Sequence, residues 1–189
     1  MIKIRQRMLY TPIFHIDTNL INARGSLLAM NLIEKWAADE IILVNMSGIS
    51  FKEALAGNNA LRIKKALAQL FTLTDESIDT NCQRYREIEN TIFPGGAKNE
   101  NQHNDVKVVY DAAHWNAILV TRDGASKSQP GGILGNRNQL RKFVQIMSDT
   151  EAVKFILSKI AERDDVNRRV SKETGQPLPE WTGHDCSHV

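Results

Sequence analysis

Short apolar runs alternate along the chain with longer segments of helical periodicity. β-Branched and other apolar residues fill 13–16, 41–44 and 117–121, and each run predicts a short buried strand. Apolar positions recur at helical spacing in five segments, which are 28–36, 51–55, 60–71, 105–115 and the stretch after Ser148. This alternation predicts a three-layer α/β/α sandwich with a central, mostly parallel sheet.

Polar residues with capping ability mark where several of these helices would begin. Ser26 and Ser50 stand before the first two helices, and Asp105 would open the helix that ends near 115. Ser148 and Glu151 have the spacing of a capping box before the last helix.

One domain and a tail account for the length of 189 residues. The domain is expected at 1–170, with a polar insertion of helix and loop at about 73–104. That insertion would cover a site, mediate dimerisation or bind a partner. Residues 171–189 are polar and contain Gly and Pro, which predicts a flexible tail. Cys82 and Cys186 are expected to be free thiols.

Composition excludes some classes of protein. A hydrophobic fraction of 42% and a charged fraction of 24% are ordinary for a soluble globular protein. No apolar run approaches the roughly 20 residues that span a bilayer, and no apolar segment follows the charged start, so we expect a cytoplasmic protein without a membrane partner. A net charge of +2 excludes a nonspecific basic coat protein but allows a local basic patch for nucleic acid.

Two acidic residues follow predicted strands directly. Asp17 ends the first strand region, and Asp123 ends the third. Ligands of open parallel sheets bind beyond the carboxyl ends of the strands, so both residues are candidates for a site. Crowded carboxylates raise one another's pKa unless a cation compensates, so a cluster of them indicates a hard divalent ion, Mg²⁺ or Mn²⁺.

Four short motifs, in order, resemble those of the PIN-domain nuclease family. They are an apolar strand followed by Asp-Thr-Asn, a helix with an early Glu, a helix-opening Asp, and an apolar strand ending in Thr-x-Asp. The matching segments are 13–19, 49–55, 105–113 and 118–123. Each motif alone has low specificity, whereas four in the right order and spacing form a more specific signal.

The resemblance implies a PIN-like fold and a metal-dependent endoribonuclease. Four acids would bind Mg²⁺ or Mn²⁺ and support hydrolysis of single-stranded or structured RNA; they are Asp17, Glu53, Asp105 and Asp123. Three further residues are expected near them, namely Asn19, Thr121 and Asp111.

Two aspartates of one predicted helix compete for the third motif. Asp105 has the family's usual spacing to Thr121, and a place at the helix start suits a carboxylate. Asp111 comes later and, at about 100° per residue, points away from Asp105. We therefore assign Asp105 to the site and Asp111 to its surroundings or to the surface.

Each acid also has a purely structural interpretation. Asp17 and Asp105 would serve as caps, Glu53 as an ordinary acid of a first helical turn, and Asp123 before Gly124 as a turn residue.

Other segments have two interpretations as well. The glycine-rich segment 131–137 is a connecting loop or a groove wall with Arg137 on phosphate, and the first of these is favoured. The cluster 184–188 contains metal-ligand residue types, yet it lacks the paired spacing of a zinc site.

Three functional alternatives stay open. A toxin-type PIN nuclease would have an antitoxin-like protein partner, and a homodimer is a further candidate assembly. A PIN-like module that has lost catalysis would bind RNA without cutting it. An aspartyl phosphotransferase would use Asp17 after its strand, although Asn19 stands where that chemistry commonly has a second Asp.

Overall fold

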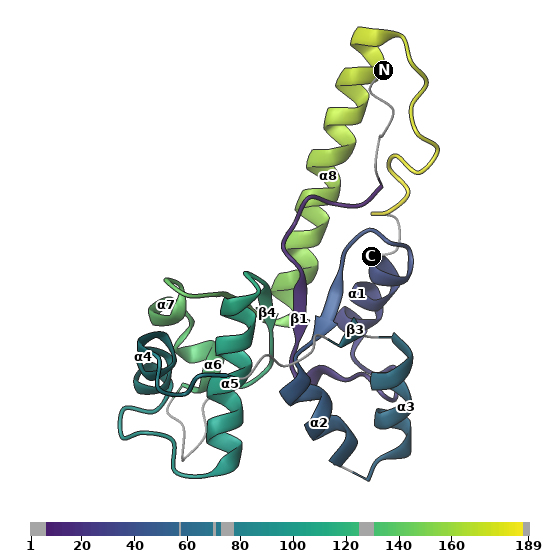
Figure 1. The fold of residues 1–189 in the computed structure, drawn as a ribbon. Helices are drawn as coiled ribbons and strands as arrows, with labels where there is room; N and C mark the ends of the chain where they lie inside the picture. Colours follow the sequence, from purple (N-terminus) through teal and green to yellow (C-terminus); the bar gives the residue numbers. More distant parts are fainter. Residues whose placement is uncertain (1–6, 57, 70, 73–77, 125–130, 187–189) are drawn as a thin grey trace.

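The computed structural model of the chain (Figure 1) describes residues 7–56, 58–69, 71–72, 78–124 and 131–186. In these ranges, no helix has an apolar stretch long enough to cross a membrane.

A parallel sheet of five strands, in the order β3-β2-β1-β4-β5, forms the centre of the fold. The strands are β1 (Phe14–Ile16), β2 (Val44–Met46), β3 (Phe71–Thr72), β4 (Ile118–Val120) and β5 (Gln145–Met147). His15 of β1 is in register with Asn45 of β2 and with Leu119 of β4. Because all pairings are parallel, the carboxyl ends of the strands meet at one edge of the sheet.

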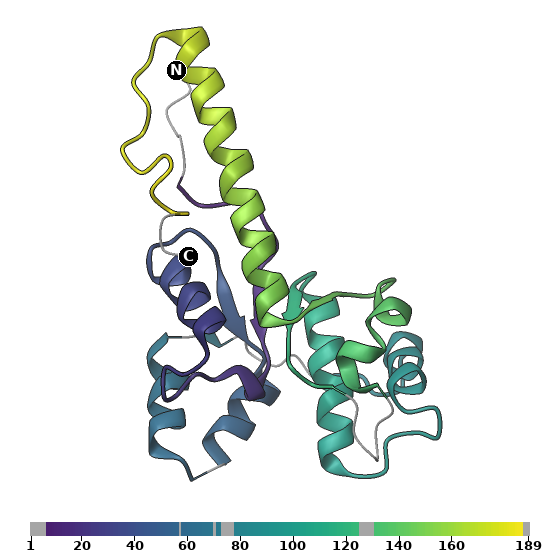
Figure 2. The ribbon, with the colours of Figure 1, turned by 180° about the vertical axis from the view of Figure 1, so that it is seen from behind.

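Helices cover both faces of this sheet, which confirms the predicted three-layer α/β/α architecture (Figures 1 and 2). The helices are a 3₁₀ turn η1 (Thr18–Leu20), α1 (Leu28–Ala38), α2 (Gly48–Ala56), α3 (Ala60–Gln69), α4 (Gln83–Ile92), α5 (Glu100–His114), α6 (Gly132–Gly135), α7 (Arg137–Leu140) and α8 (Asp149–Thr174). One face packs against α1 and α8, and the other packs against α4, α5 and the short helices α6 and α7.

Alternating side chains of the strands supply the two cores. Phe14 and Ile16 of β1 lie in the core shared with α1 and α8. Leu119 and Ile146 lie in the second core, beside α4 and α5. This alternation is the expected consequence of the two-residue period of a strand.

The strand predictions were partly correct. The apolar runs at 13–16 and 117–121 contain β1 and β4, which confirms both. The strand predicted at 41–44 is displaced toward the C-terminus. Ile41 and Ile42 are buried but precede the strand, and β2 begins only at Val44. Two short strands, β3 and β5, were not predicted; they flank the sheet and are two and three residues long.

Several predicted helix starts were wrong. In α2, Ser47 Oγ accepts the Ser50 backbone N–H at 3.1 Å, so Ser47 caps the helix and Ser50 lies inside it. The first helix, α1, begins after Leu27 without a side-chain cap, so Ser26 does not cap it.

Helix α5 begins earlier than predicted, and α8 begins as expected. The start of α5 is at Glu100, where Asn99 caps it through a 3.0 Å hydrogen bond from the Gln102 backbone N–H. Asp105 is therefore internal and does not open the helix. The capping box of Ser148 and Glu151 is present at the start of α8.

The segment predicted as an insertion belongs to the core in its described part. Helix α4 buries Tyr85, Ile88 and Ile92 against α5. Residues 100–104 are the first residues of α5. Positions 73–77 of the predicted insertion lie outside the described residues.

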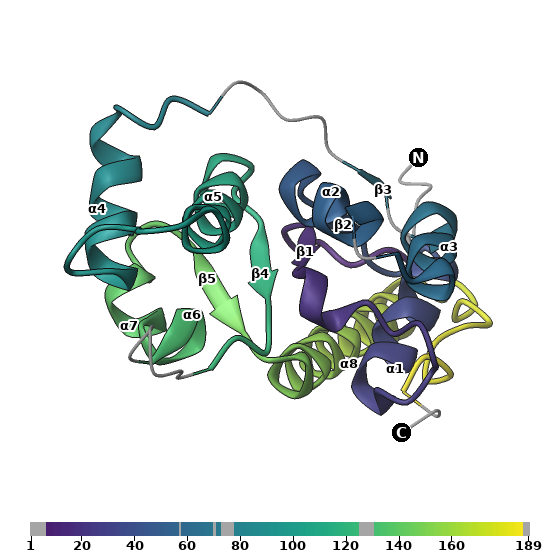
Figure 3. The same cartoon turned by 90° about the horizontal axis from the view of Figure 1, so that it is seen from below.

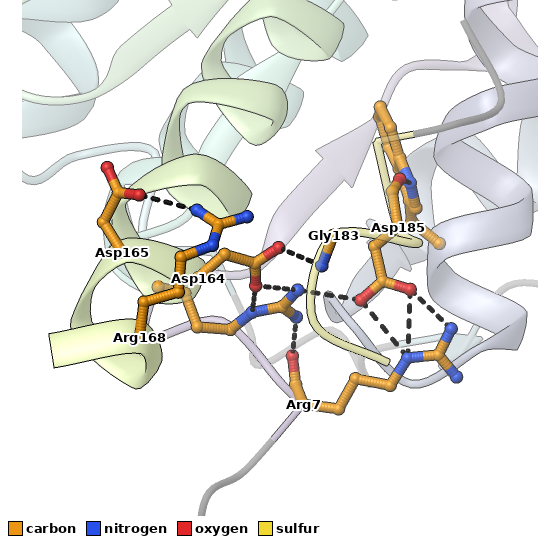
Figure 4. A network of polar contacts seen from close by, with 8 residues as sticks. Arg7, Asp164, Asp165, Arg168, Gly183 and Asp185 are labelled. Carbon is orange, nitrogen blue, oxygen red and sulfur yellow. Dashed lines mark hydrogen bonds and ion pairs between the residues drawn. The ribbon is translucent and has the colours of Figure 1, made fainter. Parts of the chain in front are cut away.

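The described end of the predicted tail, residues 181–186, contacts the domain. Helix α8 continues to Thr174 and projects away from the sheet, and the chain then returns alongside it (Figure 1). Asp185 is only 2% exposed and accepts hydrogen bonds from Arg7 at 2.6 Å and from Arg163 at 2.8 Å (Figure 4). Trp36 Nε1 donates to the carbonyl of Asp185 at 3.1 Å. These contacts attach the segment at Asp185 to α1, α8 and the start of the described chain.

Candidate functional site

Four elements bring the sequence-predicted acids to the carboxyl edge of the sheet. Asp17 follows β1 directly, and Asp123 follows β4. Glu53 lies on α2 and Asp105 on α5, two helices that contact each other; seen from below, α2 lies near β1 and β2, and α5 lies near β4 (Figure 3). Glu53 lies in the second turn of α2, not in the first turn as predicted.

Asp17 is held by three hydrogen bonds. Its Oδ1 accepts the Thr18 backbone N–H at 2.6 Å. Its Oδ2 accepts Thr121 Oγ1 at 2.6 Å and Asn19 Nδ2 at 2.7 Å. Asp17 as a residue is 9% exposed, and these donors fix the orientation of its carboxylate at the strand tip. Asn19 and Thr121 thus lie beside Asp17, as the sequence predicted.

Glu53 is tied to both neighbouring elements. Thr18 Oγ1 donates to Glu53 Oε2 at 2.7 Å, and Asn104 Nδ2 donates to Oε1 at 2.9 Å. Thr18 therefore contacts Asp17 through its backbone and Glu53 through its hydroxyl. The sequence prediction assigned no role to Thr18 or Asn104, although each is adjacent in sequence to a predicted acid.

The glycine-rich segment holds Asp123. The Ile133 backbone N–H donates to Asp123 Oδ2 at 2.7 Å. Gly132 has φ +56°, and a Cβ at this position would lie 2.2 Å from the carbonyl oxygen of Gly124. Only glycine therefore allows this close approach. The favoured interpretation of 131–137 as a connecting loop was wrong, since the segment forms α6 and orients a predicted site residue.

Two arginines near this segment are paired within the protein. Arg137 forms an ion pair of 2.7 Å with Glu151 at the start of α8. Arg122 donates from Nε and Nη2 to the buried Asp149 at 3.0 and 2.6 Å, and its backbone N–H donates to Asn19 Oδ1 at 3.2 Å. Arg122 therefore connects the tip of β4 with η1 and α8.

The electrostatics of the four acids are mutually unfavourable. Burial raises the pKa of Asp17 to about 6, against the hydrogen bonds from Thr121 and Thr18. Burial, followed by the negative charges of Asp123, Asp17 and Glu53, raises the pKa of Asp105 to about 7. The four carboxylates thus act on one another electrostatically, which is the situation that a bound cation relieves.

Asp111 is buried on α5 and does not lie on the surface. Its side chain is 8% exposed and lies 3.8 Å from Nδ1 of His15. Burial lowers the pKa of His15 to about 4, so the imidazole is neutral at pH 7. The His15 ring that faces Asp111 is therefore buried and neutral.

Three of the four acids accept hydrogen bonds from groups of the protein itself. In the ranges that the structure describes, no group of three His, Cys, Asp or Glu side chains is positioned to hold one metal ion. The donors to Asp17, Glu53 and Asp123 are hydroxyl, amide and backbone N–H groups, which satisfy carboxylate oxygens without a cation.

A cavity borders the site beside Glu53. It has a volume of about 710 Å³ and lies between α2 and α5, where Lys52, Asn104 and Lys107 also line it. The carboxyl edge of the sheet thus has a space in which a ligand reaches Glu53.

No family model matches the chain, and no curated protein matches it. Among solved structures, it is similar to VapBC-1 from nontypeable Haemophilus influenzae, with 20% sequence identity and a TM-score of 0.46. The match covers 73% of this chain and 98% of that chain. A similarity of this extent assigns no function to the present chain.

Proposed function

We propose that the protein is a metal-dependent endoribonuclease whose centre consists of Asp17, Glu53, Asp105 and Asp123. The observation that carries the proposal is the approach of these acids, from β1, α2, α5 and β4, to one edge of the sheet, where burial and then the charges of the other three raise the pKa of Asp105. Repulsion between these carboxylates lowers the stability of the folded protein. A function in binding a cation would explain why the acids are nevertheless placed together.

The donor set fits a hard divalent ion. All four candidate ligands are carboxylates, and oxygen ligands are those that Mg²⁺ and Mn²⁺ prefer. When bound, such an ion activates a water molecule and neutralises charge on a phosphodiester. The resemblance of the four motifs to those of PIN nucleases supports RNA as the substrate.

The surrounding residues of the chain orient the acids for this task. Thr121 and Asn19 donate hydrogen bonds to Oδ2 of Asp17. These bonds fix the direction of the whole carboxylate, including its Oδ1. Thr18 joins Asp17 to Glu53 and thereby couples the strand tip to α2. Thr18, Asn19 and Thr121 thus fix the direction of two of the four acids before an ion binds.

A nuclease assay with a matched acid control tests the proposal. Wild-type protein, Asp17→Asn and Asp165→Asn are incubated with mixed oligoribonucleotides in Mn²⁺, Mg²⁺ or chelator. Asp165 is the control because it is an exposed acid of α8. We expect metal-dependent cleavage by wild type and Asp165→Asn, and a loss of at least about 100-fold in Asp17→Asn. Unchanged cleavage by Asp17→Asn would refute the proposal.

Calorimetry with Mn²⁺ distinguishes the neighbouring alternatives. A protein that binds Mn²⁺ and RNA without cleavage is a binding module that has lost catalysis. Trapping of a phosphorylated Asp17 would identify the phosphotransferase. The nuclease activity would also suit a toxin-type protein, and a small neighbouring gene for an antitoxin would identify that role.

A further inference from the structure

A second cavity, of about 510 Å³, borders Thr18 and Asn19. Its other walls come from the loop after η1 and from the start of α3, which contribute Arg24, Asn59 and Arg62. Of the residues that the structure describes, no acidic one lines this space, which we call the arginine cavity. It therefore combines positive charge and amide groups next to an acidic centre.

Arg62 is fixed against the backbone of the candidate centre. Its Nη2 donates to the carbonyl oxygen of Thr18 at 2.6 Å, and its backbone N–H donates to Asn59 Oδ1 at 3.1 Å. Thr18 is the residue that contacts both Asp17 and Glu53. The guanidinium group of Arg62 is thus bonded to Thr18, the residue that orients Asp17 and Glu53.

The two arginines of the cavity differ from five other arginines of the described ranges. Among the described residues, those that form ion pairs with carboxylates are Arg7, Arg122, Arg137, Arg163 and Arg168. Arg24 and Arg62 form no ion pair with a carboxylate of the described ranges. No carboxylate of the described residues therefore neutralises these two positive charges, and an anion can bind to them.

The chemistry of the cavity suits a phosphate group. A guanidinium presents several N–H donors in a fork that matches phosphate oxygens, and the amide of Asn59 is a further donor. Asn59 also precedes the first turn of α3, a ten-residue helix without acidic residues in that turn. Phosphate contacts of this kind position a strand without reading its sequence.

We propose that the arginine cavity binds a backbone phosphate of the RNA strand, next to the phosphodiester at the acidic centre. This inference rests on the proposed function and specifies how that site would hold its substrate. Asn19 lines the cavity and also holds Asp17, so a phosphate in the cavity lies close to the acids. The centre would then cleave an RNA strand that reaches the cavity with higher efficiency than a small phosphodiester that has no second phosphate.

Binding of a fluorescein-labelled single-stranded 12-mer RNA tests the cavity. The measurements use the Asp17→Asn protein with Mn²⁺, so that the strand stays intact, at several salt concentrations. Arg24→Gln and Arg62→Gln are compared with Arg169→Gln, an exposed arginine near the far end of α8. We expect each cavity variant to weaken binding roughly threefold to tenfold and to lower the salt slope by about 0.7, with Arg169→Gln unchanged.

Arg24→Gln is the decisive variant, because Arg24 makes no hydrogen bond or ion pair with a residue of the described ranges. Its effect on binding therefore does not arise from a displaced Thr18. A second readout is cleavage in the Asp17 wild-type background. There Arg24→Gln should raise the KM for RNA and leave hydrolysis of bis(p-nitrophenyl) phosphate unchanged.

The outcomes separate this inference from the nuclease proposal. Equal affinity and equal salt slope in Arg24→Gln overturn the cavity proposal, whether or not the wild type cleaves RNA. Arginine-dependent binding without any metal-dependent cleavage overturns the nuclease proposal and supports the cavity. Absence of RNA binding by the Asp17→Asn protein with both arginines present overturns the cavity proposal, whereas cleavage by the wild type alone decides the nuclease proposal.

Discussion

Thr121 Oγ1 donates a hydrogen bond of 2.6 Å to Asp17 Oδ2, between residues 104 positions apart in sequence. The same hydroxyl oxygen accepts the Asp123 backbone N–H at 2.9 Å. One buried hydroxyl group thus connects the tips of two adjacent parallel strands and contacts two of the candidate acids. The geometry of the centre therefore depends on the pairing of β1 with β4.

Replacing Thr121 by valine should impair the centre. Thr121→Val removes a hydrogen bond that lowers the pKa of Asp17, so this pKa should rise above about 6. It also leaves the Asp123 N–H without this acceptor, at a cost of about 1–3 kcal/mol. We expect weaker Mn²⁺ binding at pH 6–7 by calorimetry. Thr121→Ser keeps the hydroxyl and should retain wild-type affinity; equal weakening in both variants would contradict the assigned role.

The stability of the metal-free protein should depend on pH through Asp105. Its pKa is raised from 3.8 to about 7, so the folded state binds the proton more tightly than the unfolded state. This stabilisation is present below about pH 4 and is lost as the pH rises through 7. Asp105→Asn should therefore be more stable than wild type at pH 8, by on the order of 1 kcal/mol after solvent screening.

Thermal unfolding from pH 5 to 8 in chelator measures this effect. Added Mn²⁺ should raise the melting temperature of the wild type at pH 8 more than that of Asp105→Asn. Asp165→Asn serves as the control and should follow the wild-type curve. A melting temperature of Asp105→Asn below that of wild type at pH 8 would argue against the repulsion.

Gly132→Ala should displace Asp123. The positive φ and the approach to the Gly124 carbonyl exclude a Cβ, so the substitution should cost about 1–3 kcal/mol. Because Ile133 holds the Asp123 carboxylate, activity should fall about tenfold or more. Gly135→Ala is the matched control, since a Cβ there meets no atom within 4 Å. Urea denaturation and the RNA cleavage assay, applied to both variants, test the difference.

The C-terminal segment should contribute to stability through Asp185. Burial would raise the pKa of this carboxyl, but hydrogen bonds from Arg7 and Arg163 outweigh it and lower the pKa. Asp185→Asn should therefore destabilise the protein by about 3 kcal/mol at pH 7, with the difference decreasing as the pH falls below about 4.

Asp165→Asn is the control for this experiment as well (Figure 4). Its ion pair with Arg168 is exposed, and exposed pairs contribute less than about 1 kcal/mol. Equal unfolding free energies for Asp185→Asn and wild type would show that the segment does not stabilise the domain.

Local sequence patterns determined the architecture and part of the candidate site. The apolar runs that contain β1 and β4 predicted the strands, and hence the position of Asp17 at a strand end. Helical periodicity and a capping box predicted α8. These features depend on residues close together in sequence, so a pattern of period two or 3.6 reveals them.

Only the tertiary structure decided the features that depend on distant partners. The short strands β3 and β5 exist because a neighbouring strand pairs with them, and a two- or three-residue run has no periodicity of its own. The start of α5 was missed because its first residues are polar and are stabilised by the Asn99 cap. The close approach of Gly132 to Gly124 likewise requires the folded loop.

The same distinction applies to the chain end and to the arginine cavity. Asp185 is buried only because Arg7, 178 positions away, and Arg163 supply the compensating charges. Arg62 lies beside Thr18 only because α3 packs near η1, and its sequence neighbours do not distinguish it from a surface arginine. The sequence by itself determined which residue types were present at strand ends and helix faces. The pairing of charges across the fold was decided by tertiary structure, because electrostatic and hydrogen-bond partners need proximity in space and not in sequence.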